Sequence, residues 1–291
     1  MSTNDSKSSD MSKLSPSLKA LINAPFARPG PTAAPAKIRD IYASIARDAA
    51  AKKLGLRPWL TITAATTFTL NSPDSLPILH GVASQSTDGV HAAEFIREVG
   101  LKCIAFNGIP RTINNLNAFH AALPESVSSS LSTTPSRART AKNLGPSIER
   151  GRGLWDSVYR PFENKLYNKL ALAHPDLPVH ILNSEYAGLL SDPPTSERGS
   201  LANLGRIMTS IIAISCLRAQ TGVGPQVLSH VFGLRKGMED GTYKADNMTA
   251  EEEAAARWLA SDEGSEWILK TVDEIAEALG GSNFAPAKAK L

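Results

Sequence analysis

The sequence predicts an all-α protein, and three observations support this fold class. Apolar residues recur every three or four positions through most of the 291-residue chain, which is the spacing of one face of a helix. Glycine and proline stand where these segments stop, as they commonly do at helix ends. No two alternating segments are joined by the short turn that marks a β-hairpin. We therefore expect helices to supply the core.

Three helices are predicted before residue 125, each with its own stop signal. They cover about 36–54, 87–107 and 110–123. Gly55 ends the first, and Asn107-Gly108 is a strong stop for the second. Pro110 suits the first turn of the third, and Pro124 closes it.

The segment from Trp59 to Leu70 is ambiguous. Its threonines and Ile62 suit a strand. Its length and continuous apolarity suit a buried helix instead. Both interpretations stay open on the residues alone.

Six further helices are predicted after residue 150. They cover 153–173, 179–190, 199–220, 223–237, 250–260 and 264–279. Thr249 and Glu252 have capping-box spacing at the start of the fifth. Gly280-Gly281 stops the last.

Composition divides the chain into five parts. They are a flexible N-terminal segment (1–36), a first helical repeat (37–124), a linker (125–150), a second helical repeat (151–281) and a flexible tail (282–291). The first part is rich in Ser, Lys, Pro and Ala, and the third in helix breakers. We interpret the third as a linker or a mobile excursion. The two repeats share a layout, since an apolar run precedes His80 in one and His230 in the other.

The C-terminal residues Ala289, Lys290 and Leu291 resemble a type 1 peroxisomal targeting signal. A small residue, a cation and a terminal Leu with its free carboxylate are what a receptor pocket would need. The resemblance implies a helical-repeat import receptor as a partner and the peroxisomal matrix as the location. The alternative is a chance ending.

Charge, hydropathy and cysteine content exclude several classes. The net charge is +3 without a long basic run, so we expect no nucleic-acid partner. The most apolar run, 207–217, is too short for a bilayer, so we expect no membrane span. Cys103 and Cys216 form neither a disulfide framework nor a zinc motif, and we interpret them as buried reduced thiols.

The segment 94–119 carries a family resemblance. Acidic Glu94 and Glu98 precede the turn Phe106-Asn-Gly-Ile-Pro110, and an Asn-x-Leu pattern follows at Asn114. This layout resembles the carboxymuconolactone decarboxylase family, to whose Leu-x-x-His element the segment 76–80 is similar. The segment 206–237 resembles the equivalent part of the wider alkyl hydroperoxidase D-like superfamily. The whole chain is similar to fungal-type, two-repeat members.

The resemblance implies a bundle of packed antiparallel helices, usually assembled into homo-oligomers, and it favours helix for Trp59–Leu70. The peroxidase branch needs a Cys-x-x-Cys pair placed seven and four residues before the histidine. Pro73 and Leu76 occupy those positions before His80, and Val223 and Gln226 before His230. A thiol peroxidase cycle is therefore excluded, and no cofactor is expected.

Four residues are candidates for acid-base chemistry. His80 and His230 could move protons near neutral pH. Arg111, directly after the Gly-Ile-Pro turn, could bind a carboxylate. Glu94 is the fourth candidate, one helical turn from Arg97.

Each candidate also has a structural interpretation. The histidines could each make one buried hydrogen bond, and Arg111 could form a salt bridge at an oligomer seam. The charged residues of the segment 94–102 could form a solvated face with helix-spaced ion pairs; they are Glu94, Arg97, Glu98 and Lys102.

Two functions are therefore predicted. One is decarboxylase-like acid-base chemistry on a small organic acid or lactone, and the other is a non-catalytic helical protein that retains only the fold. A pocket with a histidine facing Arg111 would favour the first. Metal binding is not expected, because no His-x3-His or carboxylate cluster has ligand spacing.

Overall fold

The computed structural model describes residues 14–199, 201–282 and 284. The chain divides into two units, residues 1–31 and 32–291. The first unit contains α1 (Pro16–Ile22), capped by the Ser15 side chain, and the short 3-10 turn η1 (Pro25–Ala27). The predicted targeting signal Ala289, Lys290 and Leu291 lies outside the described residues.

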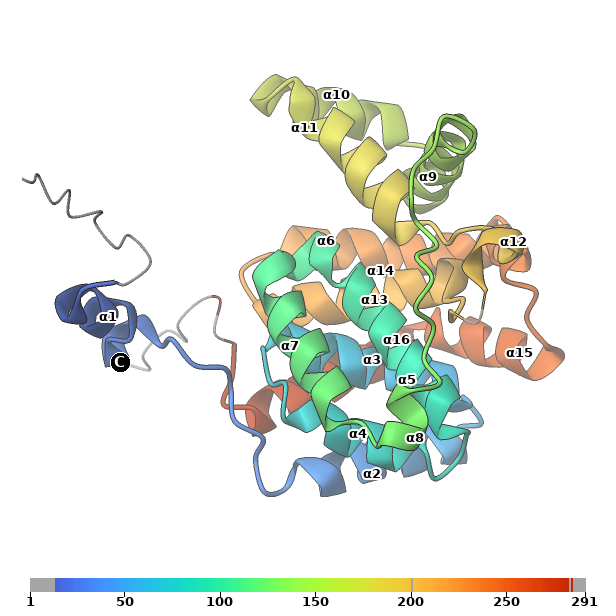
Figure 1. Cartoon of the computed structure of the whole chain (residues 1–291). Coiled ribbons are helices and arrows are strands. Elements are labelled where there is room, and N and C mark those ends of the chain that lie inside the picture. The colour runs from blue at the N-terminus through green and yellow to red at the C-terminus, as the bar shows by residue number, and fades with distance from the viewer. Residues whose placement is uncertain (1–13, 200, 283, 285–291) are drawn as a thin grey trace, which may run out of the picture. The chain divides into compact units, whose positions relative to one another are not determined.

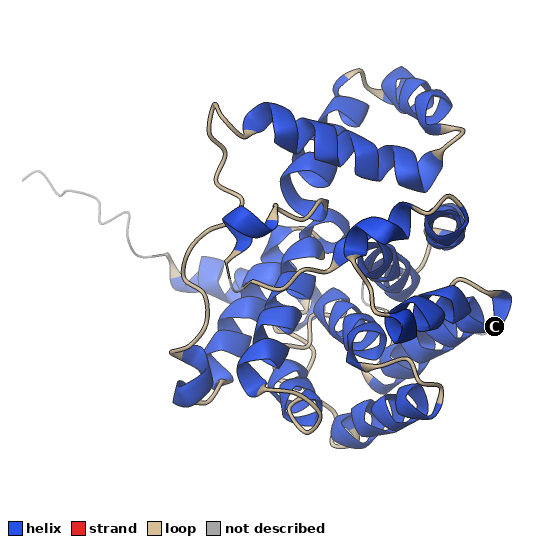
Figure 2. Cartoon of the chain, turned by 90° about the vertical axis from the view of Figure 1, so that its right-hand side faces the viewer, coloured by secondary structure: helices blue, strands red, loops and turns tan. Residues whose placement is uncertain are grey.

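The prediction of an all-α fold is confirmed. Over the described residues every regular element is a helix (Figure 2). The elements of the second unit up to residue 159 are α2 (Ile38–Ala51), α3 (Leu56–Thr69), α4 (Ser75–Ala83), α5 (Gly89–Lys102), α6 (Ile104–Asn107), α7 (Ile109–Ala122), α8 (Glu125–Ser128) and α9 (Leu144–Tyr159). The remaining elements are α10 (Glu163–Ala173), α11 (Asp176–His180), the π-helix η2 (Ile181–Leu190), α12 (Thr195–Arg198), α13 (Gly205–Gln220), α14 (Gly224–Glu239), the 3-10 turn η3 (Thr242–Asp246), α15 (Ala250–Leu259) and α16 (Asp262–Ala278).

The ambiguous segment at Trp59 is helical, as α3. The hydroxyls of Thr63, Thr66 and Thr69 each donate to the backbone carbonyl four residues earlier. These bonds satisfy the hydroxyls inside the helix, so threonine can be buried there without a partner from elsewhere. All but the first two residues of α3 are buried.

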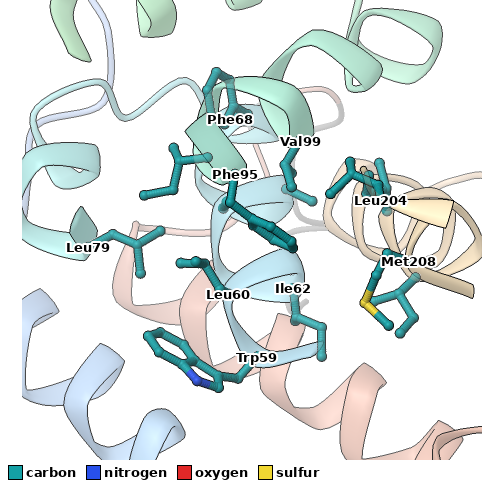
Figure 3. Packing of buried hydrophobic residues seen from close by; sticks show 14 of the residues in the cluster. Trp59, Leu60, Ile62, Phe68, Leu79, Phe95, Val99, Leu204 and Met208 are labelled. Carbon is teal, nitrogen blue, oxygen red and sulfur yellow. The ribbon is translucent and has the colours of Figure 1, made fainter. Parts of the chain in front are cut away.

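The helices α3 and α13 form the centre of the second unit. They pack against each other, and α16 contacts both (Figure 1). Around α3, the side chains of Leu60, Phe68 and Phe95 are almost completely buried. They belong to one cluster with Leu204, which directly precedes α13, and Met208 of α13 (Figure 3). Burial of this much apolar surface is the main stabilising term of such a bundle.

A smaller apolar cluster lies apart from this core. Trp155 of α9 and Tyr186 and Leu190 of η2 are its buried members. The helices α9 and η2 pack against each other, and α9 also contacts α14 (Figure 1). This second cluster surrounds the candidate site described below.

Three predicted helices are divided in the structure. The segment 87–107 divides at Cys103 into α5 and α6. The segment 153–173 breaks between α9 and α10, where Arg160 is extended before Pro161; a residue before proline disfavours the helical conformation. The segment 179–190 starts as α11 and continues as the π-helix η2. A π-helix needs tertiary support, which local sequence does not reveal.

Candidate functional site

His230 lies at the junction of α14 with α9 and η2. Its imidazole is buried, and Nε2 lies 3.4 Å from the hydroxyl of Tyr159. The hydroxyl of Tyr186 donates to that of Tyr159 over 3.2 Å. The three side chains therefore form a chain of polar groups through an otherwise apolar cluster.

The π-helix η2 brings Tyr186 into this chain. Its ring packs edge-on against Trp155, with centroids 5.2 Å apart, and Trp155 also contacts Tyr159 at 4.3 Å. π-helices are rare in proteins, and those that occur often lie at functional sites. Rigid aromatic packing of this kind holds the two hydroxyls in place.

Arg206, at the start of α13, is the charged group of the site. Its guanidinium donates to the hydroxyl of Ser157 (2.7 Å) and to the backbone carbonyls of Ser157 (3.1 Å) and Gly233 (2.6 Å). A fourth bond reaches the hydroxyl of Ser210. All four partners are neutral, and among the described residues no carboxylate forms an ion pair with Arg206. One of its five N–H donors is left over.

Burial and this cation set the protonation of His230. Desolvation is the larger cause and the charge of Arg206 the smaller, and together they lower the pKa of His230 to about 4. The imidazole is therefore neutral at pH 7. Its Nδ1 is buried without a hydrogen-bond partner among the described residues. Burial also lowers the pKa of Arg206 and raises that of Tyr159.

Two cavities meet at this site. A small one, of about 10 Å³, is lined by His230, Arg206 and Tyr186 among others, and it has room for about one water molecule. A pocket of about 630 Å³ lies next to it and shares Arg206 and Thr209 in its wall. His230 lines the smaller cavity and not the larger pocket, so Arg206 is the charged side chain that faces both.

Some polar groups that line the larger pocket have hydrogen-bond partners, and at least one does not. Asp246 accepts the backbone N–H groups of Arg206 and Ile207, and Asp192 accepts that of Gly205. These two carboxylates therefore cap the start of α13. Arg150 also lines the pocket, and its buried Nε has no hydrogen-bond partner among the residues that the structure describes.

His80, the other predicted histidine, has a different environment. It is buried on α4, where Nε2 lies 2.9 Å from the Gly89 carbonyl and 3.3 Å from the Ser84 hydroxyl. Its ring packs edge-on against Phe119, which is completely buried. The bond to Gly89 is a buried hydrogen bond of the kind that the structural interpretation predicts, made inside the main core.

Arg111 and Glu94 have partners of their own. Arg111 donates to the Thr69 carbonyl, and its guanidinium lies 3.7 Å above the ring of Phe284. Glu94 is buried on α5, accepts from Arg97 over 3.1 Å and accepts the backbone N–H of Ser132 over 2.6 Å. Among the described residues, neither shares a contact with His80 or His230.

The predicted solvated face of α5 is wrong for three of its four members. Glu94 and Glu98 are each 3% exposed and Lys102 is completely buried. Glu98 binds Arg137, and Lys102 lies 2.8 Å from Asp192 and donates to Thr209 over 2.9 Å. The helix-spaced pair Glu94–Arg97 exists, but the other partners come from distant segments.

Sequence reasoning identified His230 as a candidate but missed Arg206, Tyr159 and Tyr186 as its neighbours. Arg206 did carry a signal, since it is a cation directly before the apolar run 207–217. A charge at the end of such a run is costly to bury unless it has a specific environment. Tyr159 and Tyr186 carried no such signal in the sequence. They lie close to each other because α9 packs against η2.

Within the described ranges, no three His, Cys, Asp or Glu side chains are grouped so that they could hold a metal ion. Over the same ranges, no helix has the length and apolarity needed to cross a bilayer.

One curated protein was found to be similar to this chain. It is "Peroxisomal protein 2" of Saccharomyces cerevisiae, 24% identical over 246 residues, which cover 64% of this chain and 84% of the yeast protein. No family model matches the chain. No solved structure matches it either.

Proposed function

We propose that this chain is a protein of the peroxisomal matrix. Two independent observations support the location: the name of the yeast relative and the C-terminal Ala289-Lys290-Leu291, which an import receptor would bind. Imaging of an N-terminally tagged chain tests this. Punctate fluorescence should become diffuse when Leu291 is deleted, and unchanged puncta would contradict the role of the tail.

At His230 we propose acid-base chemistry on a small organic acid or lactone. The observation that carries this is a neutral, buried imidazole beside Arg206, a buried cation whose hydrogen-bond partners among the described residues are all neutral. Asp240 and Asp246 act on the guanidinium without forming an ion pair with it, and a carboxylate that reaches Arg206 would supply that direct ion pair. Arg206 then has the substrate-binding role that the sequence suggested for Arg111.

A bound carboxylate would also prepare His230 for proton transfer. Arg206 lowers the pKa of His230 by charge repulsion, and a bound anion would cancel that repulsion. The pKa would then rise towards neutrality, where a histidine is most effective as a general base. Tyr159 and Tyr186 would pass the proton along their hydroxyl chain.

For the fold, we propose two related repeats in an alkyl hydroperoxidase D-like bundle that assembles into a homo-oligomer. In support, the long buried helices α3 and α13 pack together, and each is followed by a helix that carries one of the histidines. The boundaries predicted from composition, with repeats over 37–124 and 151–281, are part of this proposal. Light scattering of the purified chain measures the assembly, and a monomer would contradict it.

The test of the site is a titration of His230 by NMR. Adding millimolar acetate or butyrate to the full chain should raise the pKa of His230 from about 4 by up to about one unit, because the charge of Arg206 is the smaller of its two causes. Arg206→Met should abolish this response. Arg218→Gln is the matched control, because Arg218 is an exposed arginine of the same helix that pairs with Asp273.

A non-catalytic helical protein is the second candidate. It is favoured by the small volume beside His230, about 10 Å³, and by the structural bonds of His80, Arg111 and Glu94. A His230 pKa that does not respond to carboxylates would decide for this candidate.

A further inference from the structure

The two cysteines of the chain meet in the core. Cys103 ends α5 and Cys216 lies on α13, 113 residues later, yet their Sγ atoms are 3.5 Å apart. Both side chains are completely buried. A disulfide has an S–S length of about 2.05 Å, so the sulfurs must approach by about 1.5 Å, a shift that side-chain rotation with a small helix movement can supply.

The pair connects two walls of the His230 cavity. Cys103 directly precedes α6, whose Phe106 lines that cavity and packs edge-on against His230 at 6.1 Å. On the other side, α13 contributes Arg206 and Thr209 to the same cavity. The two cysteines therefore lie on the two segments that supply these walls.

We propose that Cys103 and Cys216 are an oxidisable pair whose disulfide joins α5 to α13 and alters the His230 site. The first half of this proposal, disulfide formation, is independent of any ligand. The second half, the effect on ligand binding, rests on the function proposed for His230.

A hydroperoxide is an oxidant of sufficient power for this step. One thiol, as thiolate, attacks the peroxide oxygen and becomes a sulfenic acid, and the O–O bond breaks to release an alcohol, or water from hydrogen peroxide. The second thiol then attacks the sulfenic sulfur, forms the S–S bond and releases water. Two thiols and one hydroperoxide thus give one disulfide, one alcohol and one water.

This reaction is stoichiometric and slow, unlike a peroxidase cycle. Burial raises the pKa of Cys103 and so keeps it as the thiol. Cys216 is not activated by a cation either, since its contacts among the described residues, besides Cys103, are the Asn107 amide at 3.9 Å and the Ala65 carbonyl at 4.0 Å. The oxidant must therefore enter by a local opening of the helices, and the disulfide would then record prolonged oxidation.

The first measurement is the intact mass of the full chain after exposure to hydrogen peroxide. We expect a loss of about 2 Da, the two hydrogens of the thiols, and a tryptic peptide pair that joins Cys103 to Cys216. Cys103→Ala and Cys216→Ala should each prevent this loss, and dithiothreitol should reverse it. Unchanged mass, or gains of about 16 Da per oxygen on unlinked cysteines, would overturn the proposal.

The second measurement compares reduced and oxidised chains for the carboxylate response of His230. The apparent affinity should differ by about fivefold or more between the two forms. If the disulfide forms and the affinities are equal, regulation of the site is contradicted. If neither form responds to carboxylates, the function proposed for His230 fails, while the mass measurement still decides whether the disulfide exists.

Discussion

His80 and His230 follow similar apolar helices in the sequence, but the structure places them in different kinds of surroundings. His80 lies in the main core, with a 2.9 Å hydrogen bond and a fully buried aromatic neighbour. His230 lies beside the smaller cluster, with a long contact of 3.4 Å, a buried arginine nearby and no hydrogen-bond partner for Nδ1 among the described residues. We therefore expect the contacts of His230 to contribute less to the free energy of unfolding than those of His80. They also leave its imidazole able to bind a ligand or transfer a proton.

The lesson is that a histidine after an apolar helix has no fixed role. Where a short hydrogen bond and close aromatic packing hold the ring, as at His80, the residue is part of the packing. Where a nitrogen is buried without a partner beside a cation and a cavity, the polar group is better explained by a ligand, a water molecule or proton transfer. Four measurements would break or sharpen this contrast.

The largest expected effect is on the aromatic neighbours of the two histidines. Phe119→Ala, beside His80, should lower the free energy of unfolding by about 3–5 kcal/mol, because Phe119 is completely buried in the core. Phe106→Ala, beside His230, should cost about half as much or less, since Phe106 is only half-buried. Denaturant unfolding measures both, and equal losses would contradict the contrast.

The next effect is a pH dependence that comes from His230. Its folded pKa of about 4 lies below the unfolded value of 6.5, so the unfolded chain binds the extra proton first. The contribution of His230 to the free energy of unfolding is therefore fully present above pH 6.5. It is lost as the pH falls through 4, and the total loss is about 3 kcal/mol.

The control for this pH effect is His230→Gln, whose side chain does not titrate in this range. Unfolding curves at pH 7 and pH 4.5 should differ less for this variant than for the original chain. An undiminished difference would show that other groups cause the acid sensitivity.

A smaller effect is expected for His80→Ala. The loss of the hydrogen bond to Gly89 and of the contact with Phe119 should lower the free energy of unfolding by about 2 kcal/mol. The carboxylate response of His230 should remain. If that response disappeared while the chain stayed folded, His80 would belong to the site after all.

The smallest effect is expected for Tyr159→Phe. Among the described residues, its hydroxyl contacts His230 and Tyr186 over long distances, so the free energy of unfolding should change by about 1 kcal/mol or less. If the proton moves along the hydroxyl chain, this variant should nevertheless slow proton transfer at His230. Turnover of a substrate, or NMR exchange of the imidazole proton, measures this.

Local signals predicted most of the helices. The capping box of Thr249 and Glu252 is present at the start of α15, because its bonds lie within four residues. Gly55 and Gly108 both adopt positive φ beside helix ends, where glycine carries no Cβ penalty. The π-helix η2 was not predicted, because it depends on tertiary packing. The break at Pro161 was not predicted either, because the apolar pattern continues across it.

The candidate site was predicted only in part. His230 was found because histidine is rare and its chemistry is distinctive. Arg111 was chosen for carboxylate binding because it follows a helix-starting turn, but the structure gives it the Thr69 carbonyl and Phe284. Arg206 is the arginine that lies near His230. The two residues belong to different helices, α13 and α14, so only the folded chain brings them together.

By itself, the sequence determined the all-α class and most helix boundaries, because helical periodicity and stop residues act over a few neighbouring positions. Tertiary structure alone decided which polar residues are buried and with whom. Lys102 shows the reason: its spacing with Glu98 suits a solvated ion pair, yet it is completely buried against Asp192, 90 residues later. The free energy of a buried charge depends on partners that only the folded chain brings near.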